Sequence, residues 1–123
     1  MRMKLANVAV RICAQERSDL SRFRLCAVVA AGSRIISHGI NHFPNNGTAR
    51  PLSIHAEVAA IRRIPHDTEA TDIYVVRLLA NGQLACSRPC INCMKAILEA
   101  HIDSVHFVNE NGEWVTQEIN YEE

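Results

Sequence analysis

The sequence carries no excess of charge of either sign. Its 123 residues include 13 basic and 13 acidic side chains, and no block of like charge forms a tail. Proteins that bind duplex nucleic acid through its phosphates normally present an excess of positive charge, so the composition argues against tight duplex binding. A local basic patch is still possible, although ordinary solvated surface is the simpler interpretation of these arginines. The residues that could form such a patch lie close together in sequence: Arg17, Arg22, Arg24 and Arg34.

Long apolar runs are also missing. No stretch approaches the roughly 20 apolar residues that a membrane-spanning helix needs. The start of the chain, from Met1 to Lys4, lacks the apolar segment and small-residue cleavage site of a secretory signal. We therefore expect a cytoplasmic protein without a membrane partner. In a reducing compartment the five cysteines are expected to be free thiols, and a close Cys-x-x-Cys pair there indicates a metal site or a redox centre.

The chain shows no internal repeat, linker or low-complexity tract. With 48% hydrophobic and 21% charged residues, it has the composition of an ordinary globular protein. A chain of this length buries roughly two thirds of the surface that it exposes when unfolded, so one hydrophobic core is sufficient. The sequence predicts a single domain over residues 1–123.

Hydrophobic spacing predicts an alternation of helices and strands. Helices are predicted over residues 3–17, 54–64 and 90–100. Strands are predicted over residues 25–30, 34–38, 73–76 and 104–108, the first two as a hairpin. Ser53 is the expected N-cap of the second helix and Pro65 its stop. Turn formers fill residues 39–53, and a connection of this length is often part of a binding site.

This order of elements predicts an α/β fold. Helices should cover a sheet, and strands that a helix connects should pair in parallel. A final turn is expected at residues 109–112, before Trp114 and Val115.

Two short motifs carry the candidate chemistry. His55-Ala56-Glu57 lies at the start of the second predicted helix, and Pro89-Cys90-Ile91-Asn92-Cys93 lies at the start of the third. Each motif alone is weak, because a histidine near a carboxylate arises by chance and Cys-x-x-Cys also occurs in redox proteins. Together, one imidazole and two thiolates match a tetrahedral zinc with a fourth position open, as a catalytic metal requires. A structural zinc with Cys86 or His101 as fourth ligand is the alternative.

The predicted position of both motifs at helix starts favours this chemistry. Unpaired amides and a partial positive charge at a helix N-terminus lower the pKa of a thiol there. Glu57 lies two residues from His55, so it projects in a different direction and is free to move protons. Zinc lowers the pKa of bound water, so Glu57 could take its proton and pass it to the ring nitrogen and the departing amine of a nucleobase. Ammonia and a carbonyl would result.

The pairing of H-x-E with P-C-x-x-C resembles the signature of zinc-dependent nucleobase deaminases. The chain is similar to the cytidine and deoxycytidylate deaminase superfamily over most of its length, including residues 24–29 and 87–90. The resemblance implies a three-layer fold, with a mixed sheet of about five strands and helices on both faces. It also implies a homo-oligomeric hydrolase that binds Zn²⁺ through His55, Cys90 and Cys93 and uses Glu57 as its proton shuttle.

The resemblance extends to contacts with the substrate. Asn41 looks like the family asparagine that contacts the substrate sugar, with an ordinary turn residue as the alternative, and the amide of Ala56 would hold the edge of the base. Arg88, next to the metal motif, is the best placed candidate for a further substrate contact. Other candidates for a phosphate contact are His42, Thr48, Arg50 and Arg77. Cys26 occupies a place that is commonly glycine in relatives.

A histidine as the first ligand resembles the deoxycytidylate, tRNA adenosine and riboflavin-pathway branches, since free-nucleoside cytidine deaminases usually present cysteine there. The short, neutral chain favours a small nucleotide over a folded RNA. The sequence thus predicts a compact phage- or virus-type deoxycytidylate deaminase that converts dCMP to dUMP.

Two other functions stay open at this point. The first is a polynucleotide deaminase that acts on tRNA or on single-stranded DNA or RNA and uses the arginine cluster for backbone contacts. The second is a non-catalytic zinc-binding module, against which the intact Glu57 argues. No chemistry is assigned to the remaining cysteines and three histidines. The cysteines Cys13, Cys26 and Cys86 are expected to be small buried side chains, and His38, His66 and His106 to be surface or strand residues.

Overall fold

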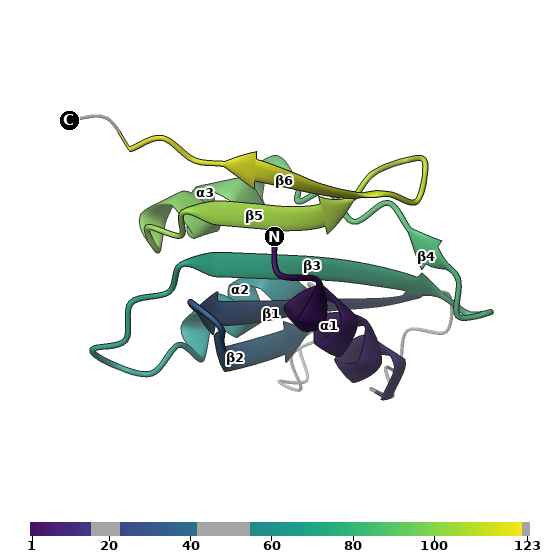
Figure 1. The fold of residues 1–123 in the computed structure, drawn as a ribbon, viewed down its shortest axis with the longest axis horizontal. Helices are drawn as coiled ribbons and strands as arrows, with labels where there is room; N and C mark the ends of the chain where they lie inside the picture. The colour runs from purple at the N-terminus through teal and green to yellow at the C-terminus, as the bar shows by residue number, and fades with distance from the viewer. Residues whose placement is uncertain (16–22, 42–54, 122–123) are drawn as a thin grey trace, which may run out of the picture.

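The computed structural model describes residues 1–15, 23–41 and 55–121. Within these ranges the chain forms three helices and six strands (Figure 1). The helices are α1 (Met3–Gln15), α2 (Ala56–Arg62) and α3 (Ile91–Glu99). The strands are β1 (Phe23–Ala31), β2 (Arg34–Ile40), β3 (Asp72–Leu79), β4 (Leu84–Ala85), β5 (Ser104–Val108) and β6 (Trp114–Glu118).

The strands form one mixed sheet in the order β2-β1-β3-β5-β6, and the short β4 pairs with β3. β3 and β5 pair in parallel because α3 connects them, whereas the other pairs are antiparallel. The predicted α/β class, mixed sheet and parallel pairing are confirmed. The sequence did not predict β4 as a strand, since two residues leave no periodicity to detect, and it gave no strand assignment to β6.

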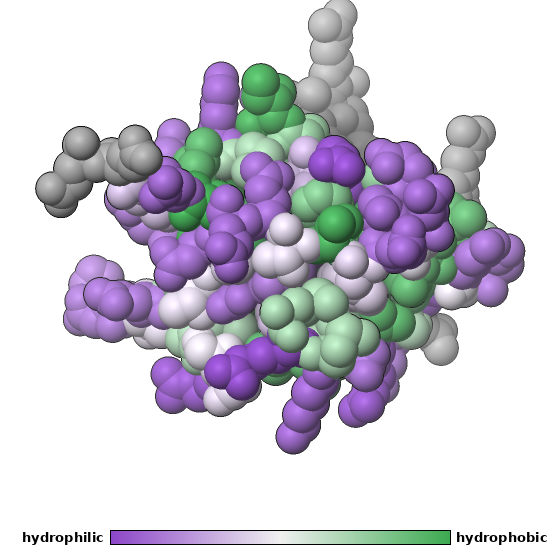
Figure 2. Space-filling view, turned by 45° about the horizontal axis from the view of Figure 1, so that its top comes forward, coloured by the Kyte–Doolittle hydropathy of each residue, from purple (hydrophilic) through white to green (hydrophobic). Residues whose placement is uncertain are grey.

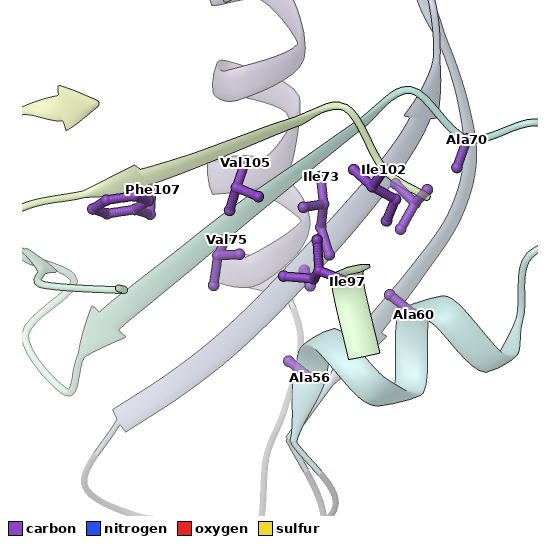
Figure 3. Packing of buried hydrophobic residues seen from close by; sticks show 11 residues of the cluster. Ala56, Ala60, Ala70, Ile73, Val75, Ile97, Ile102, Val105 and Phe107 are labelled. Atoms are coloured by element: carbon purple, nitrogen blue, oxygen red, sulfur yellow. The ribbon is translucent and has the colours of Figure 1, made fainter. Parts of the chain in front are cut away.

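Helices cover both faces of the sheet, as expected. α1 lies on one face, and α2 and α3 lie on the other (Figure 1). A hydrophobic core lies on each face of the sheet. The side chains of β3 contribute alternately to the two cores, because successive side chains of a strand point to opposite faces. Ile73 and Val75 belong to the core under α2 and α3, and Tyr74 and Val76 belong to the core under α1. Ile97 of α3 points at the first of these cores (Figure 3).

The position of α2 depends on a glycine in β2. A Cβ atom built on Gly39 would lie 2.5 Å from the amide nitrogen of Ala60 and 2.7 Å from the carbonyl oxygen of Ala56. Both are backbone atoms of α2, which cannot move aside as a flexible side chain can. Alanines in the sequence of α2 and the missing side chain at position 39 therefore let helix and strand approach closely, and this approach fixes where His55 and Glu57 lie.

The start of α2 differs from its prediction. The helix begins at Ala56, and its N-cap position is His55, whose side chain makes no capping hydrogen bond. The predicted cap Ser53 lies outside the described residues. Among the described helices, none is long and apolar enough to cross a membrane. Figure 2 shows a largely hydrophilic face with apolar side chains in small groups.

A buried polar network joins three strands on the α1 face. His106 of β5 is 1% exposed. Its Nε2 lies 2.7 Å from Oδ2 of Asp72, and its Nδ1 lies 2.8 Å from Oγ1 of Thr116. The ring stacks on Tyr74 with 4.3 Å between centroids. A neutral imidazole satisfies both contacts by donating to the carboxylate and accepting from the hydroxyl. His106 lies in a strand, as expected. It is also buried, and its side chain connects β5 to β3 and β6 through hydrogen bonds.

We expect His106 to make folding stability depend on pH. Burial lowers the pKa of His106 below its ordinary value of 6.5, although the Asp72 carboxylate opposes this shift. The unfolded chain therefore binds more protons below about pH 6.5, so the free energy of unfolding should fall as the pH drops from 7 to 5. His106→Gln should flatten this slope in denaturant titrations. His66→Gln, at a side chain that is 97% exposed, should leave it unchanged. Equal slopes in all three proteins would contradict a buried neutral imidazole.

Candidate metal centre

Two helix starts bring His55, Cys90 and Cys93 together. Their ligand atoms all lie within 4.8 Å of one another. Nδ1 of His55 lies 3.1 Å from Sγ of Cys93 and 3.6 Å from Sγ of Cys90. Zinc–nitrogen and zinc–sulfur bonds of ordinary length at a tetrahedral angle place such atoms about 3.6 Å apart. The three side chains are thus positioned for a zinc ion, with room for a fourth, non-protein ligand.

The backbone holds these residues at matching places. His55 and Cys90 are the N-cap residues of α2 and α3, and both have extended backbone angles. Cys93 lies in the first turn of α3, where the amide of Met94 bonds to the carbonyl oxygen of Cys90. Because α2 and α3 pack against each other on one face of the sheet, their starts share one end of that face.

The alternative of a structural zinc with four protein ligands finds no support in the described part of the chain. The cluster there consists of the three predicted residues alone. Cys86 is half-buried, and its Sγ lies 3.8 Å from Oε1 of Glu110. His101 follows the far end of α3 and stacks on Tyr121, with 4.9 Å between the ring centroids.

Glu57 lies beside the metal-binding residues and is 2% exposed. Its Oε1 is buried and makes no hydrogen bond to any described residue. Burial raises the pKa of this carboxyl group, opposed by hydrogen bonds from the Glu57 backbone and Cys93 and by the charge of His55. A buried carboxylate oxygen without a partner is costly, so among the described residues this oxygen still lacks the polar group that it needs. A metal-bound water or a substrate would provide such a group.

The thiol of Cys93 departs from the sequence prediction. A helix start was expected to lower cysteine pKa values, but burial raises the pKa of Cys93, and the charge of Glu57 and the Cys90 sulfur raise it further. A coordinated dication reverses the balance, because a thiol that binds a metal is deprotonated.

A cavity of about 250 Å³ opens beside these groups. His55, Glu57 and Cys90 line it. The other lining residues are Leu25 of β1, Arg77 of β3, and Cys86, Ser87 and Arg88 of the segment before α3. A larger cavity of about 590 Å³ lies by the other ends of α2 and α3, and no residue of either motif lines it.

The predicted substrate contacts fall in different places. Arg88 lines the cavity, with its guanidinium 4.6 Å from the centroid of Phe107 and its Nε 3.8 Å from Oε1 of Glu110. Asn41 is buried and connects the end of β2 to β1 through two hydrogen bonds of 3.0 Å. Its side-chain Oδ1 accepts a hydrogen bond from the backbone amide of Leu25, and its backbone amide donates to the carbonyl oxygen of Leu25. It is therefore an anchor beside the cavity rather than an ordinary turn residue. Ala56 is fully buried at the first position of α2.

The other residues singled out in the sequence also lie in different places, some at the cavity and some elsewhere in the fold. Arg77 lines the cavity. Arg24 donates from Nη1 to the carbonyl oxygen of Ala14 at 2.7 Å, near the end of α1, so it is engaged within the fold. Cys13 and Cys26 are fully buried as predicted, whereas the expectation of a buried side chain at Cys86 is wrong. The candidates outside the described residues are Arg17, Arg22, His42, Thr48 and Arg50.

Comparison with known proteins shows the family of this chain. The family model described as the cytidine and deoxycytidylate deaminase zinc-binding region matches residues 2–109. The chain belongs to this deaminase family. Zinc is the metal of this family of deaminases, and His55, Cys90 and Cys93 are positioned to bind it.

Solved structures of deaminases share the fold at low identity. Cytidine deaminase from Burkholderia pseudomallei superposes with a TM-score of 0.70 at 18% identity, over 96% of this chain and 92% of that one. The Mycobacterium leprae cytidine deaminase gives 0.63 at 19% identity, over 94% and 93%. The dCMP deaminase of cyanophage S-TIM5 gives 0.60 at 18% identity, over 89% and 86%. No curated protein sequence matches the deaminase chain significantly.

Proposed function

We propose that this deaminase hydrolyses the exocyclic amine of cytosine in a small nucleotide, converting dCMP to dUMP and ammonia. The observation that carries the proposal is the buried Oε1 of Glu57, which has no partner among the described residues, on a residue that lines the same cavity as His55 and Cys90. A structural zinc site needs no such carboxylate, whereas a hydrolytic site needs a group that carries protons.

The residues of the site have two roles, metal binding and proton transfer. His55, Cys90 and Cys93 would hold the zinc, which would supply an activated water when it is bound. Glu57 would take a first proton from the attacking water and deliver it to the ring nitrogen of the base. It would then take the second proton of that water from the new C–O–H group and pass it to the departing amine, which leaves as ammonia while the carbonyl group forms.

Two further contacts orient the substrate. The amide of Ala56 is at the first position of α2, where a helix offers no internal acceptor, and it holds the edge of the base. Asn41 fixes the strand end beside cavity-lining Leu25, which supports a contact with the sugar.

The choice of a phosphorylated substrate rests on the charges that line the cavity. Arg77 and Arg88 both face it, and a guanidinium binds phosphate with paired, charge-assisted hydrogen bonds. The similar cyanophage enzyme is a dCMP deaminase. Arg24, which the polynucleotide alternative requires for backbone contacts, is engaged by the carbonyl oxygen of Ala14.

We also expect a homo-oligomer. Ile91 and Leu98 on α3 are 73% and 42% exposed, and large apolar side chains in such positions favour packing against another protein surface. A second copy of the chain is the partner that we propose.

The substrate is tested by measuring ammonia release from dCMP, deoxycytidine, adenine and guanine nucleotides, and cytosine-containing oligonucleotides. We expect dCMP to be preferred, and Arg88→Gln to lower kcat/KM for dCMP by about tenfold, as the loss of a charged hydrogen bond of 1.5 kcal/mol would, with little change for deoxycytidine. Arg62→Gln, at an exposed position of α2, is the matched control. Release from oligonucleotides but not from dCMP would overturn the substrate and leave the chemistry standing.

A further inference from the structure

The parallel ladder between β3 and β5 is interrupted beside the metal centre. The strands pair at Asp72–Ser104, Ile73–Val105 and Tyr74–His106 and then stop, although both continue toward the cavity. The amide of Ser104 donates to the carbonyl oxygen of Thr71, so alternate carbonyl groups of β3, at positions 71, 73 and 75, face β5. In this register the next bond would join the amide of Val108 to the carbonyl oxygen of Val75.

The hydroxyl group of Ser87 occupies the place of that bond. The amide of Val108 donates to Oγ of Ser87 at 2.8 Å, and Oγ donates to the carbonyl oxygen of Val75 at 2.7 Å. The amide of Ser87 also donates to the carbonyl oxygen of Val108 at 2.9 Å. One side chain, 4% exposed, thus replaces a direct strand-to-strand bond with a hydroxyl bridge and holds the two strands apart.

This bridge places the metal motif. Ser87 is three residues before Cys90, and its neighbours Cys86 and Arg88 line the same cavity. We infer that Ser87 is a positioning residue: its hydroxyl bridge wedges residues 86–90 between the ends of β3 and β5 and thereby sets the position of the Cys90 sulfur. The inference rests on the proposed role of Cys90 as a zinc ligand.

Removal of the hydroxyl group has two possible outcomes, and both weaken the support of the segment that leads to Cys90. If the backbone stays in place, the buried amide of Val108 and the carbonyl group of Val75 lose their partner, which is costly. If the strands close, these two groups bond to each other and the segment before α3 is displaced. Groups that orient metal ligands from outside the coordination shell typically contribute 10- to 100-fold to metal affinity.

The test is zinc affinity, measured by competition with a chromophoric chelator. We expect Ser87→Ala to bind zinc at least about tenfold more weakly than the parent protein, and Ser87→Thr, which keeps a hydroxyl group, to recover most of this loss. Thr71→Val is the control, because Oγ1 of Thr71 accepts the amide of Gly32 at 2.9 Å near the other ends of α2 and α3. Substitution with Co²⁺ should show an altered d–d spectrum for Ser87→Ala alone.

A merely structural Ser87 gives a different pattern, in which Ser87→Ala and Thr71→Val lower the melting temperature but both keep parental zinc affinity and cobalt spectra. That result would overturn the inference. Cys90→Ser separates it from the ligand assignment, because zinc bound at parental affinity by Cys90→Ser would instead remove Cys90 from the ligand set.

Hydrogen exchange of the parent protein provides a test that needs no variant. Zinc and the Ser87 bridge should stabilise each other, since coupling between two sites is reciprocal. Removal of zinc should therefore speed exchange at the Val108 amide more than at the His106 amide within the intact ladder. Equal changes at both amides would also contradict the inference.

Discussion

Glu57→Gln should lower the rate of ammonia release by about a thousandfold while zinc stays bound, as expected for the loss of a positioned proton carrier. Glutamine has nearly the same shape as glutamate, so it can fill the space beside His55 and Cys93, but it cannot take up and return a proton. Removing a buried carboxylate also removes a group whose Oε1 has no hydrogen-bond partner in the described ranges of the chain. The folded protein should therefore lose little stability.

The measurement combines a coupled ammonia assay with zinc analysis of the same samples. Glu99→Gln is the control, since it makes the same substitution at an exposed position at the end of α3 and should leave the rate unchanged. A Glu57→Gln protein that retains zinc and works within tenfold of the parent would refute the proton-carrier role. Loss of zinc in this variant would instead show that Glu57 helps to hold the metal.

Gly39→Ala should destabilise the protein by about 3 kcal/mol, at the upper end of the usual cost of overpacking. The added methyl group would lie 2.5 Å from the backbone nitrogen of Ala60 and 2.8 Å from the Cβ of Ala59. Relief requires α2 to move away from β2. Because α2 starts next to His55 and carries Glu57, the same displacement should weaken zinc binding.

Gly82→Ala provides the comparison for this prediction. Gly82 has φ +86° and nothing within 4 Å of an added Cβ atom, so alanine there costs only the backbone strain of a positive φ, about 1 kcal/mol. Denaturant unfolding and zinc titration of both variants distinguish the two effects. A Gly39→Ala variant that is no less stable than Gly82→Ala would show that helix and strand can separate without cost.

The sequence predicts the parts of this fold that depend on local pattern. Spacing of apolar residues locates the three helices and the central strands, because each element buries one face that periodicity reveals. The metal-binding residues are also predictable, since soft ligands at helix starts are rare by chance. Pro89 and the Cys-x-x-Cys spacing fix the start of α3 to within one residue.

The contributions of Ser87, His106 and Asn41 could not be predicted, for a shared physical reason. Ser87 acts by bonding Val75 and Val108, which are 12 and 21 residues away, and this requires knowledge of the register between β3 and β5. His106 looks like any polar residue in a strand until the neighbouring strands supply Asp72 and Thr116. Hydrogen bonds between distant strands leave no periodicity in the sequence.

The convergence of two helix starts gives the metal a role beyond chemistry. A zinc ion held by His55 on one side and by Cys90 and Cys93 on the other would cross-link positions that are 35 residues apart in the chain. Such a cross-link lowers the conformational entropy of the chain by closing a loop. Folding free energy is then linked to the free zinc concentration. The free zinc concentration would then set the stability of the folded protein as well as its activity.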